Sequence, residues 1–191
     1  MNRIISCVLI VICCISCKDD PIPKPGALLR LDYPQPDYNR VYLNLPFTFE
    51  KNRLADSIGR VRITGENSKG IELVYPTMRG TVYLTYKTVS EKNLNELLID
   101  AQNITQKHTI KADEIIEQPY IDEQNRVFGM FYEVGGNAAS QSQFYVTDST
   151  QHFIQGSLYF YAKPNYDSIL PAAYYLQNDI KHIMETIRWK E

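Results

Sequence analysis

Three residues in the second half of the chain, Ser140, Asp148 and His152, carry side chains that together could support nucleophilic hydrolysis. They follow one another in the chain order of an esterase triad, in which a carboxylate orients an imidazole that accepts the serine proton. Such a triad needs a turn that presents the hydroxyl to the imidazole, and no G-x-S-x-G elbow surrounds Ser140. We therefore expect Ser140 and Asp148 to shape turns, and a serine-hydrolase-like activity remains the alternative.

Metal and cofactor chemistry finds little support in the sequence. The histidines His108, His152 and His182 show no paired helical spacing, and the chain contains no H-E-x-x-H motif and no phosphate-binding G-x-x-x-x-G-K-[ST] loop. All four cysteines lie within the first seventeen residues, so the rest of the chain can form no disulfide and no cysteine-ligated metal site. We expect no catalytic residue, no bound metal and no cofactor, so the protein is predicted not to be an enzyme.

A polar segment, HTIKAD, runs from His108 to Asp113 directly after an expected helix. One interpretation is a helix C-terminus at which basic side chains stabilise the negative end of the macrodipole. The other is a contact surface for a partner protein, formed by His108, Thr109, Lys111 and Asp113. The spacing leaves both interpretations open.

The start of the chain has the pattern of an export signal. A short basic start ending in Arg3 is followed by an apolar run from Ile4 to Ile15, in which Ser6 is polar, and then by the small residue Ser16. A bilayer-spanning helix needs about 20 apolar residues, so this run is too short to be one. We interpret residues 1–16 as a signal peptide.

The residue after this segment is Cys17, and this arrangement resembles a bacterial lipobox. In a lipobox the cysteine is acylated on sulfur and becomes the new N-terminus after cleavage, so we predict Cys17 as the lipidation site. A plain secretory signal with an incidental Cys17 is the alternative. The position three residues before Cys17 holds Cys14 in place of the usual leucine, which leaves Cys13 and Cys14 as other possible acceptors.

Residues 17–26 are predicted to be a lipidated cysteine followed by a proline-rich linker. Lys18, Asp19 and Asp20 resemble the basic-acidic-acidic signal that routes some lipoproteins to the cell surface, and they equally suit a solvated linker. Three prolines then make a stiff, extended spacer that ends at Gly26. Residues 27–191 remain for one globular domain.

The composition of this domain favours a sheet with some helices. The chain has 44% hydrophobic residues, enough for one core, and its 14 Tyr and 7 Phe lie beyond residue 30 among β-branched residues. The net charge of −2 gives no general attraction for nucleic acid. We predict an α+β domain with a central antiparallel sheet packed by helices.

Alternating polar and apolar residues predict the strands. Residues 70–76 and 80–87 form a predicted antiparallel pair, and residues 125–136, 142–149 and 153–164 form a predicted meander of sequential neighbours. The runs around Pro34, Pro36 and Pro46 read as edge strands and loops.

Apolar residues at helical spacing predict two helices. The first covers residues 90–107, with Ser90 as its N-cap. The second covers the C-terminal residues from Leu170, with Pro171 in its first turn. Its apolar stripe is expected to lie on the sheet and consists of Ala173, Leu176, Ile180, Ile183 and Ile187.

Several stretches resemble the gliding-motility lipoprotein GldD family across nearly the whole chain. The most specific is GGNAASQSQFYVTDSTQHFIQGSLYF, with PKPGALLRL, LPFTFE, YPTMRGTVYLTYK, HTIKADEI and the C-terminal PNYDSILPAAYYLQNDIKHIMETIRWK in support. The resemblance implies a non-catalytic lipoprotein of the cell envelope, held in the outer or cytoplasmic membrane through Cys17, that contacts other proteins of the gliding and type IX secretion machinery. A small-ligand-binding periplasmic lipoprotein is the other alternative. The order of elements is also similar to the Mog1/PsbP-like α-β-α sandwich, a likeness of pattern that does not give function.

Overall fold

The computed structural model describes residues 31–58, 61–65, 68–90, 92–107, 112–161 and 166–190. Cys17 and the predicted signal peptide and linker lie outside the described residues, so those assignments stay predictions. The described chain contains two long helices, α2 (Leu94–Lys107) and α3 (Tyr166–Glu185), and a short 3-10 turn, η1 (Pro76–Met78). None of the helices in this part of the chain is long and apolar enough to cross a membrane.

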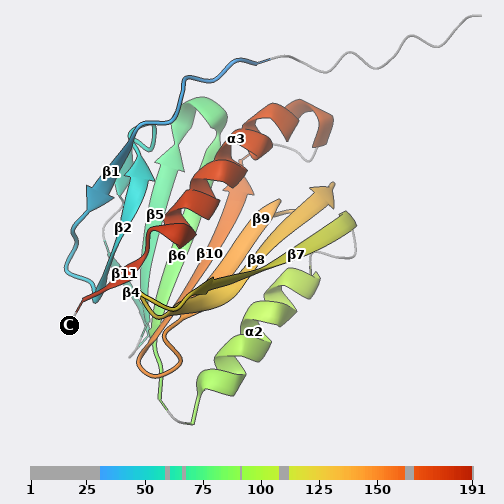
Figure 1. The fold of residues 1–191 in the computed structure, drawn as a ribbon. Helices are drawn as coiled ribbons and strands as arrows, with labels where there is room; N and C mark the ends of the chain where they lie inside the picture. The colour runs from blue at the N-terminus through green and yellow to red at the C-terminus, as the bar shows by residue number, and fades with distance from the viewer. Residues whose placement is uncertain are drawn as a thin grey trace, which may run out of the picture.

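Eleven strands of the described chain form two antiparallel sheets (Figure 1). The larger, eight-stranded sheet has the order β3-β5-β6-β10-β9-β8-β7, and β4 also pairs with β5. The smaller has the order β1-β2-β11. The strands are β1 (Tyr38–Val41), β2 (Phe47–Asn52), β3 (Ser57–Ile58), β4 (Arg62–Gly65), β5 (Ser68–Tyr75), β6 (Gly80–Thr88), β7 (Ala112–Asp122), β8 (Val127–Gly136), β9 (Ser142–Thr147), β10 (His152–Phe160) and β11 (Arg188–Trp189).

The predicted α+β class is confirmed, and so are the strand neighbours. β5 pairs with β6 from Ser68 opposite Lys87 to Tyr75 opposite Gly80. β8, β9 and β10 form the predicted meander, because short connections favour antiparallel pairing of consecutive strands. β10 pairs with β6 and so joins the meander to the β5–β6 pair, although these segments are far apart in sequence.

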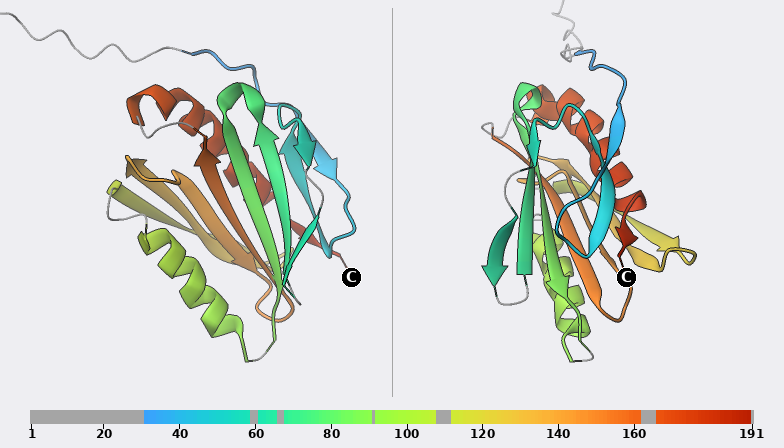
Figure 2. Two further views of the ribbon diagram at one scale, coloured as in Figure 1. Left: turned by 180° about the vertical axis from the view of Figure 1, so that it is seen from behind. Right: turned by 90° about the vertical axis from the view of Figure 1, so that its left-hand side faces the viewer.

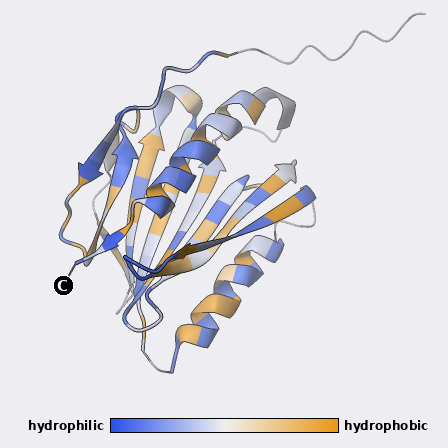
Figure 3. Cartoon of the chain, in the orientation of Figure 1, coloured by the Kyte–Doolittle hydropathy of each residue, from blue (hydrophilic) through white to orange (hydrophobic). Residues whose placement is uncertain are grey.

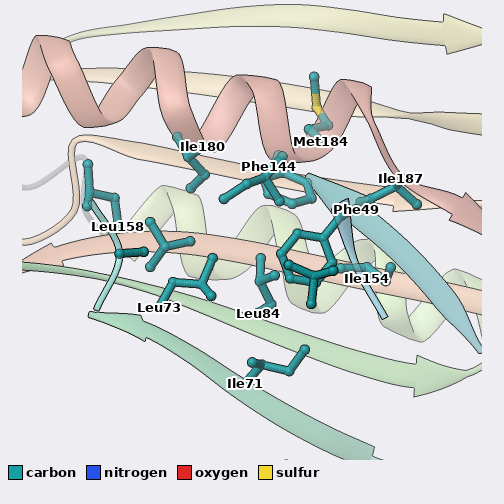
Figure 4. Packing of buried hydrophobic residues seen from close by; sticks show 14 of the residues in the cluster. Phe49, Ile71, Leu73, Leu84, Phe144, Ile154, Leu158, Ile180, Met184 and Ile187 are labelled. Carbon is teal, nitrogen blue, oxygen red and sulfur yellow. The ribbon is translucent and has the colours of Figure 1, made fainter. Parts of the chain in front are cut away.

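Helix α3 lies on one face of the large sheet and builds the main core (Figures 1 and 4). The predicted apolar stripe is buried in full, with Leu176, Ile180 and Ile183 completely shielded from solvent, but α3 ends at Glu185, so Ile187 is buried just beyond the helix. Side chains of β5, β6, β9 and β10 meet this stripe from the sheet. The opposite side of α3 is largely hydrophilic, as expected for an amphipathic helix on a sheet (Figure 3).

Helix α2 packs on the other face of the sheet, against a smaller core that includes Leu97, Ala101 and Phe153. It covers part of this face, and β5 and β6 lie beside it without a covering helix (Figure 2, left). Thr105 takes the last buried position of α2. Its hydroxyl donates to the Ala101 carbonyl at 3.3 Å and lies 3.2 Å from Gln143 Oε1.

Two predictions about where helices begin and one about the position of a strand in its sheet are wrong. The first helix begins at Leu94, not at Ser90, because the side chain of Asn93 accepts the Ser90 N–H and holds the preceding turn. Pro171 lies inside α3, which already begins at Tyr166, so its ring removes one N–H from the helix interior. The run after Pro46 was predicted to be an edge strand or loop, but it forms β2, the middle strand of the small sheet. Pro46 precedes this strand, so every residue of β2 keeps an N–H for pairing.

A buried polar cluster fastens the small sheet to α3. The Asp179 carboxylate, 1% exposed, accepts a hydrogen bond from the Tyr38 hydroxyl at 2.7 Å and from Asn52 Nδ2 at 2.9 Å. Asn52 Nδ2 also donates to the Tyr175 hydroxyl at 3.0 Å. The segment that follows the predicted linker is thereby tied to the last helix of the domain.

Candidate functional site

Ser140 lies in the connection between β8 and β9 and is completely buried. Its hydroxyl donates to the carbonyl of Ser142 at 3.2 Å, a local bond that shapes the turn into β9. Asp148 and His152 lie beyond the other end of β9. At about 3.4 Å per residue, the strand separates Ser140 from them by roughly 20 Å. The three residues therefore do not form a triad.

Asp148 organises the turn between β9 and β10. Its Oδ1 accepts the N–H groups of Thr150 at 3.0 Å, Gln151 at 2.8 Å and His152 at 2.8 Å, and its Oδ2 accepts the Thr150 hydroxyl. Burial raises the pKa of Asp148, but these donors outweigh burial and lower the pKa overall. The carboxylate acts as a turn residue, as predicted.

His152 begins β10 and belongs to an aromatic cluster. Its Nδ1 lies 3.0 Å from the Tyr86 hydroxyl, and its ring stacks on Trp189 of β11 with 5.0 Å between centroids. Burial lowers the pKa of the imidazole, and the nearby Asp148 carboxylate opposes this shift. The side chain links the large sheet to the small one.

The predicted contact segment is described in part. His108, Thr109 and Lys111 lie outside the described residues. Asp113 is exposed and belongs to β7, where a β-bulge sets it against Gly136 of β8. Gly136 has a φ of +88°, and a Cβ at this position would meet the Asp113 carboxylate at 2.6 Å, so the bulge requires glycine.

β7 is a strand that the residue pattern does not predict, and it lies at the border of the large sheet. Its consecutive Ile115 and Ile116 break the alternation that marks a strand, and Pro119 argues against a central one. Both features are tolerated because, among the described strands, β7 pairs with β8 on one side and has no strand on the other. Proline together with charge is the usual signal of an edge strand, and that signal was present in the sequence.

A small pocket opens between β7, β8 and the first half of α3, with a volume of about 120 Å³. Glu114 of β7 and Glu133 of β8 supply carboxylates, and Leu170, Ala173 and Tyr174 of α3 supply apolar walls. Gln141, from the β8–β9 connection, lines the same pocket. These residues come from four segments of the chain, so their spacing in sequence gives no hint of the site.

Further titratable side chains gather where β2 meets the end of α3. Glu50 lies between Arg40, at 3.0 Å, and His182 Nε2, at 2.9 Å. The hydrogen bond with His182 lowers the pKa of Glu50, burial opposes this, and Arg40 lowers the pKa further. The His182 ring also stacks on Tyr38 at 3.7 Å. These contacts extend the buried Asp179 cluster toward the surface.

The buried Asp179 gives a prediction about pH. Burial raises the pKa of Asp179, and the hydrogen bonds from Tyr38 and Asn52 offset part of that shift. Because the folded pKa exceeds the unfolded value of about 3.9, the protonated carboxyl favours the folded state; this contribution is complete below that value and is lost as pH rises through the folded pKa. The advantage of wild type over Asp179→Asn in free energy of unfolding should therefore be larger near about pH 4 than near about pH 7.

Urea unfolding of both proteins at the two pH values measures this difference. Asp100→Asn, on the exposed side of α2, controls for the loss of one charge. An advantage that grows toward neutral pH would mean that hydrogen bonding dominates burial at Asp179.

Among the described residues, no group of three or more His, Cys, Asp or Glu side chains is placed to hold a metal ion. The groove between α2 and β6 is lined mainly by polar side chains, namely Lys87, Asp100, Asn103, Gln106 and Lys107, with Ile104. Small-molecule sites are predominantly apolar. This groove therefore differs from a typical small-molecule site in the polarity of its lining.

The fold and the site together define an α+β domain in which the buried Asp179 cluster joins the small sheet to α3. The domain has an exposed edge strand and follows the predicted lipid anchor in the chain. The sequence profile of the family described as "Gliding motility lipoprotein GldD" matches residues 18–189. The chain belongs to this family, and it is a gliding-motility-associated lipoprotein of the cell envelope. No curated protein and no solved structure gave a significant match to the chain.

Proposed function

We propose that this lipoprotein is a non-catalytic binding component of the gliding-motility and type IX secretion machinery, held at a membrane through Cys17 and contacting other envelope proteins. The observation that carries the proposal is the placement of the candidate catalytic groups. Ser140 and Asp148 serve turns at opposite ends of β9, and His152 packs on Trp189. Family membership supports the place of action, and the exposed edge of the sheet supports the mode of action.

The signal peptide in residues 1–16 and the spacer in residues 17–26 belong to this proposal, because they would place the domain at a membrane surface and hold it off the lipid. The likeness to the Mog1/PsbP-like sandwich remains a prediction. Its implication, a small binding or assembly module, agrees with the proposed mode of action and does not establish it.

The test compares candidate catalytic groups with candidate contact groups in a motile host. Ser140→Ala, Asp148→Asn and His152→Ala should each retain gliding and secretion when compared at matched protein levels. Matching is needed because loss of a turn hydrogen bond costs about 1–2 kcal/mol and can lower abundance. Charge reversals within residues 108–113, such as Asp113→Lys, should instead reduce recovery of partner proteins from detergent-solubilised envelopes.

One outcome contradicts the proposal directly. If any of the three variants stops gliding and secretion while its abundance, fold and partner recovery stay normal, the protein has a chemical activity at that residue. The serine-hydrolase alternative would then replace the binding role.

A further inference from the structure

The outer side of β7 offers backbone groups to which no described strand pairs. The strand order of the large sheet ends at β7, which pairs with β8 along its whole length from Ala112 to Asp122. Figure 1 shows β7 at the border of the sheet beyond β8. A row of free N–H and C=O groups is a template for an added strand, and peptide recognition often uses this mode.

The side chains of β7 give this edge a single sign of charge. The strand contains Asp113, Glu114, Glu117 and Asp122, and it contains no lysine or arginine. The Asp122 carboxylate accepts a hydrogen bond from Asn125 Nδ2, and its Oδ2 lies 3.8 Å from a guanidinium nitrogen of Arg188. The ion pairs between described residues involve none of the other three carboxylates. Hydrophobic residues lie between these charges in the strand (Figure 3).

Gln141, which lines the pocket beside the edge, has a buried side-chain oxygen without a described donor. Gln141 is 6% exposed, and its Nε2 donates to the Ala138 carbonyl at 2.7 Å. Its Oε1 has no hydrogen-bond partner among the described residues. An unpaired buried acceptor costs about 1–3 kcal/mol, and a donor in the pocket relieves this cost only when the Gln141 side chain moves, because its Oε1 is shielded from solvent. A lysine ammonium or an arginine guanidinium supplies such donors and also a charge opposite to Glu114 and Glu133.

We propose that the edge of β7 over residues 112–118 binds an extended strand of a partner envelope protein that carries lysine or arginine, with one cation entering the pocket of Glu114, Glu133 and Gln141. This inference rests on the proposed function and specifies that the partner segment is extended and basic. Pro119 lacks an N–H, and proline in an edge strand normally has its nitrogen on the free side, so the paired length ends there.

The two faces of β7 set the spacing of the partner's charges. Glu114 lines the pocket under α3, whereas Glu117 lies on the opposite face with Thr105 of α2 and Tyr132. Since successive side chains of a strand alternate between faces, the matching basic residues stand an odd number of positions apart. A second copy of this chain fits poorly, because pairing β7 with itself would bring carboxylates of both chains together.

The test uses the full chain in detergent micelles and a synthetic strand peptide of about ten Thr and Val residues, with lysines three positions apart. The matched peptide has glutamate in place of both lysines. We expect the basic peptide to bind at least about tenfold more tightly than the acidic one, with slower amide hydrogen exchange in residues 112–118. The Glu114→Lys, Glu117→Lys double variant should lose this preference, and Glu114→Gln with Glu117→Gln should lose part of it.

Glu123→Lys is the matched control, because Glu123 is an exposed carboxylate beyond Pro119 and the variant should bind as wild type does. Equal binding of the two peptides, protection outside residues 112–118, or wild-type binding by the folded double lysine variant would overturn the inference. A dimer that blocks the peptide would identify a second copy as the occupant and overturn it as well. Such failures leave the proposed function in place if partner recovery from envelopes is normal, whereas loss of gliding in the Ser140, Asp148 or His152 variants contradicts the function itself.

Discussion

Replacing Ile180 with aspartate should lower the free energy of unfolding by about 3–5 kcal/mol, because the variant places an unpaired charge in the main core. Ile180 is completely buried on the side of α3 that faces the sheet, among side chains such as Leu158 and Leu73 (Figure 4). The buried described residues include no lysine, arginine or histidine that could pair with the new carboxylate. Urea unfolding followed by circular dichroism measures the change, and a loss of this size is a large fraction of the about 5–15 kcal/mol that stabilises a typical domain.

Asn178→Asp is the matched control for this substitution. Asn178 lies two residues earlier in the same helix, and its side chain is exposed, with Nδ2 3.1 Å from the Tyr174 carbonyl. The control introduces the same charge and should change the free energy of unfolding by no more than about 0.5 kcal/mol. Equal stability of both variants would show that α3 is not docked on the sheet in solution.

Replacing Cys17 with alanine should abolish acylation, leave a longer precursor and weaken attachment to the membrane. Acylation of the cysteine precedes cleavage at a lipobox, so the variant lacks both steps. Each buried CH₂ of an acyl chain contributes roughly 0.8 kcal/mol to membrane binding, and a lipoprotein carries several chains. Labelling with a fatty-acid analogue and separation of membrane from soluble fractions measure the two effects.

Cys14→Ala provides the comparison, since the variant keeps Cys17 after a small residue and should keep its label. Undiminished label in the Cys17→Ala protein would instead identify Cys13 or Cys14 as the acceptor. If gliding persists in a Cys17→Ala protein that carries no lipid, the binding function does not require the anchor.

Periodic segments of this chain could be predicted well, because their structure depends on neighbours in sequence. The β5–β6 pair and the β8–β10 meander follow from alternating residues and short turns. The apolar stripe of α3 follows from steps of three and four residues. Such a pattern places the apolar side chains on one face of the strand or helix, and that face is then buried against a neighbouring element.

Boundaries and edges were predicted less well. Ser90 has the right residue type for a cap, but the Asn93 side chain competes for the turn and moves the start of α2 to Leu94. β7 could not be predicted from the residue pattern, because polar and apolar residues need not alternate in an edge strand. Its carboxylate side chains are also typical of loops. Propensity is a weak guide where tertiary pairing decides the outcome.

By itself, the sequence determined the family, the class of fold, the segments of the main core and the candidate lipid anchor, since these depend on residue types read along the chain. Tertiary structure alone decided which polar groups meet. It separated Ser140 from His152 by the length of β9, and it joined Tyr38 and Asn52 to an aspartate 141 and 127 residues away. It also placed Glu114, Glu133 and Gln141 around one pocket at a free strand edge. Hydrogen bonds and charges act over a few ångströms in space, so only the packing of distant strands and helices brings such groups within reach.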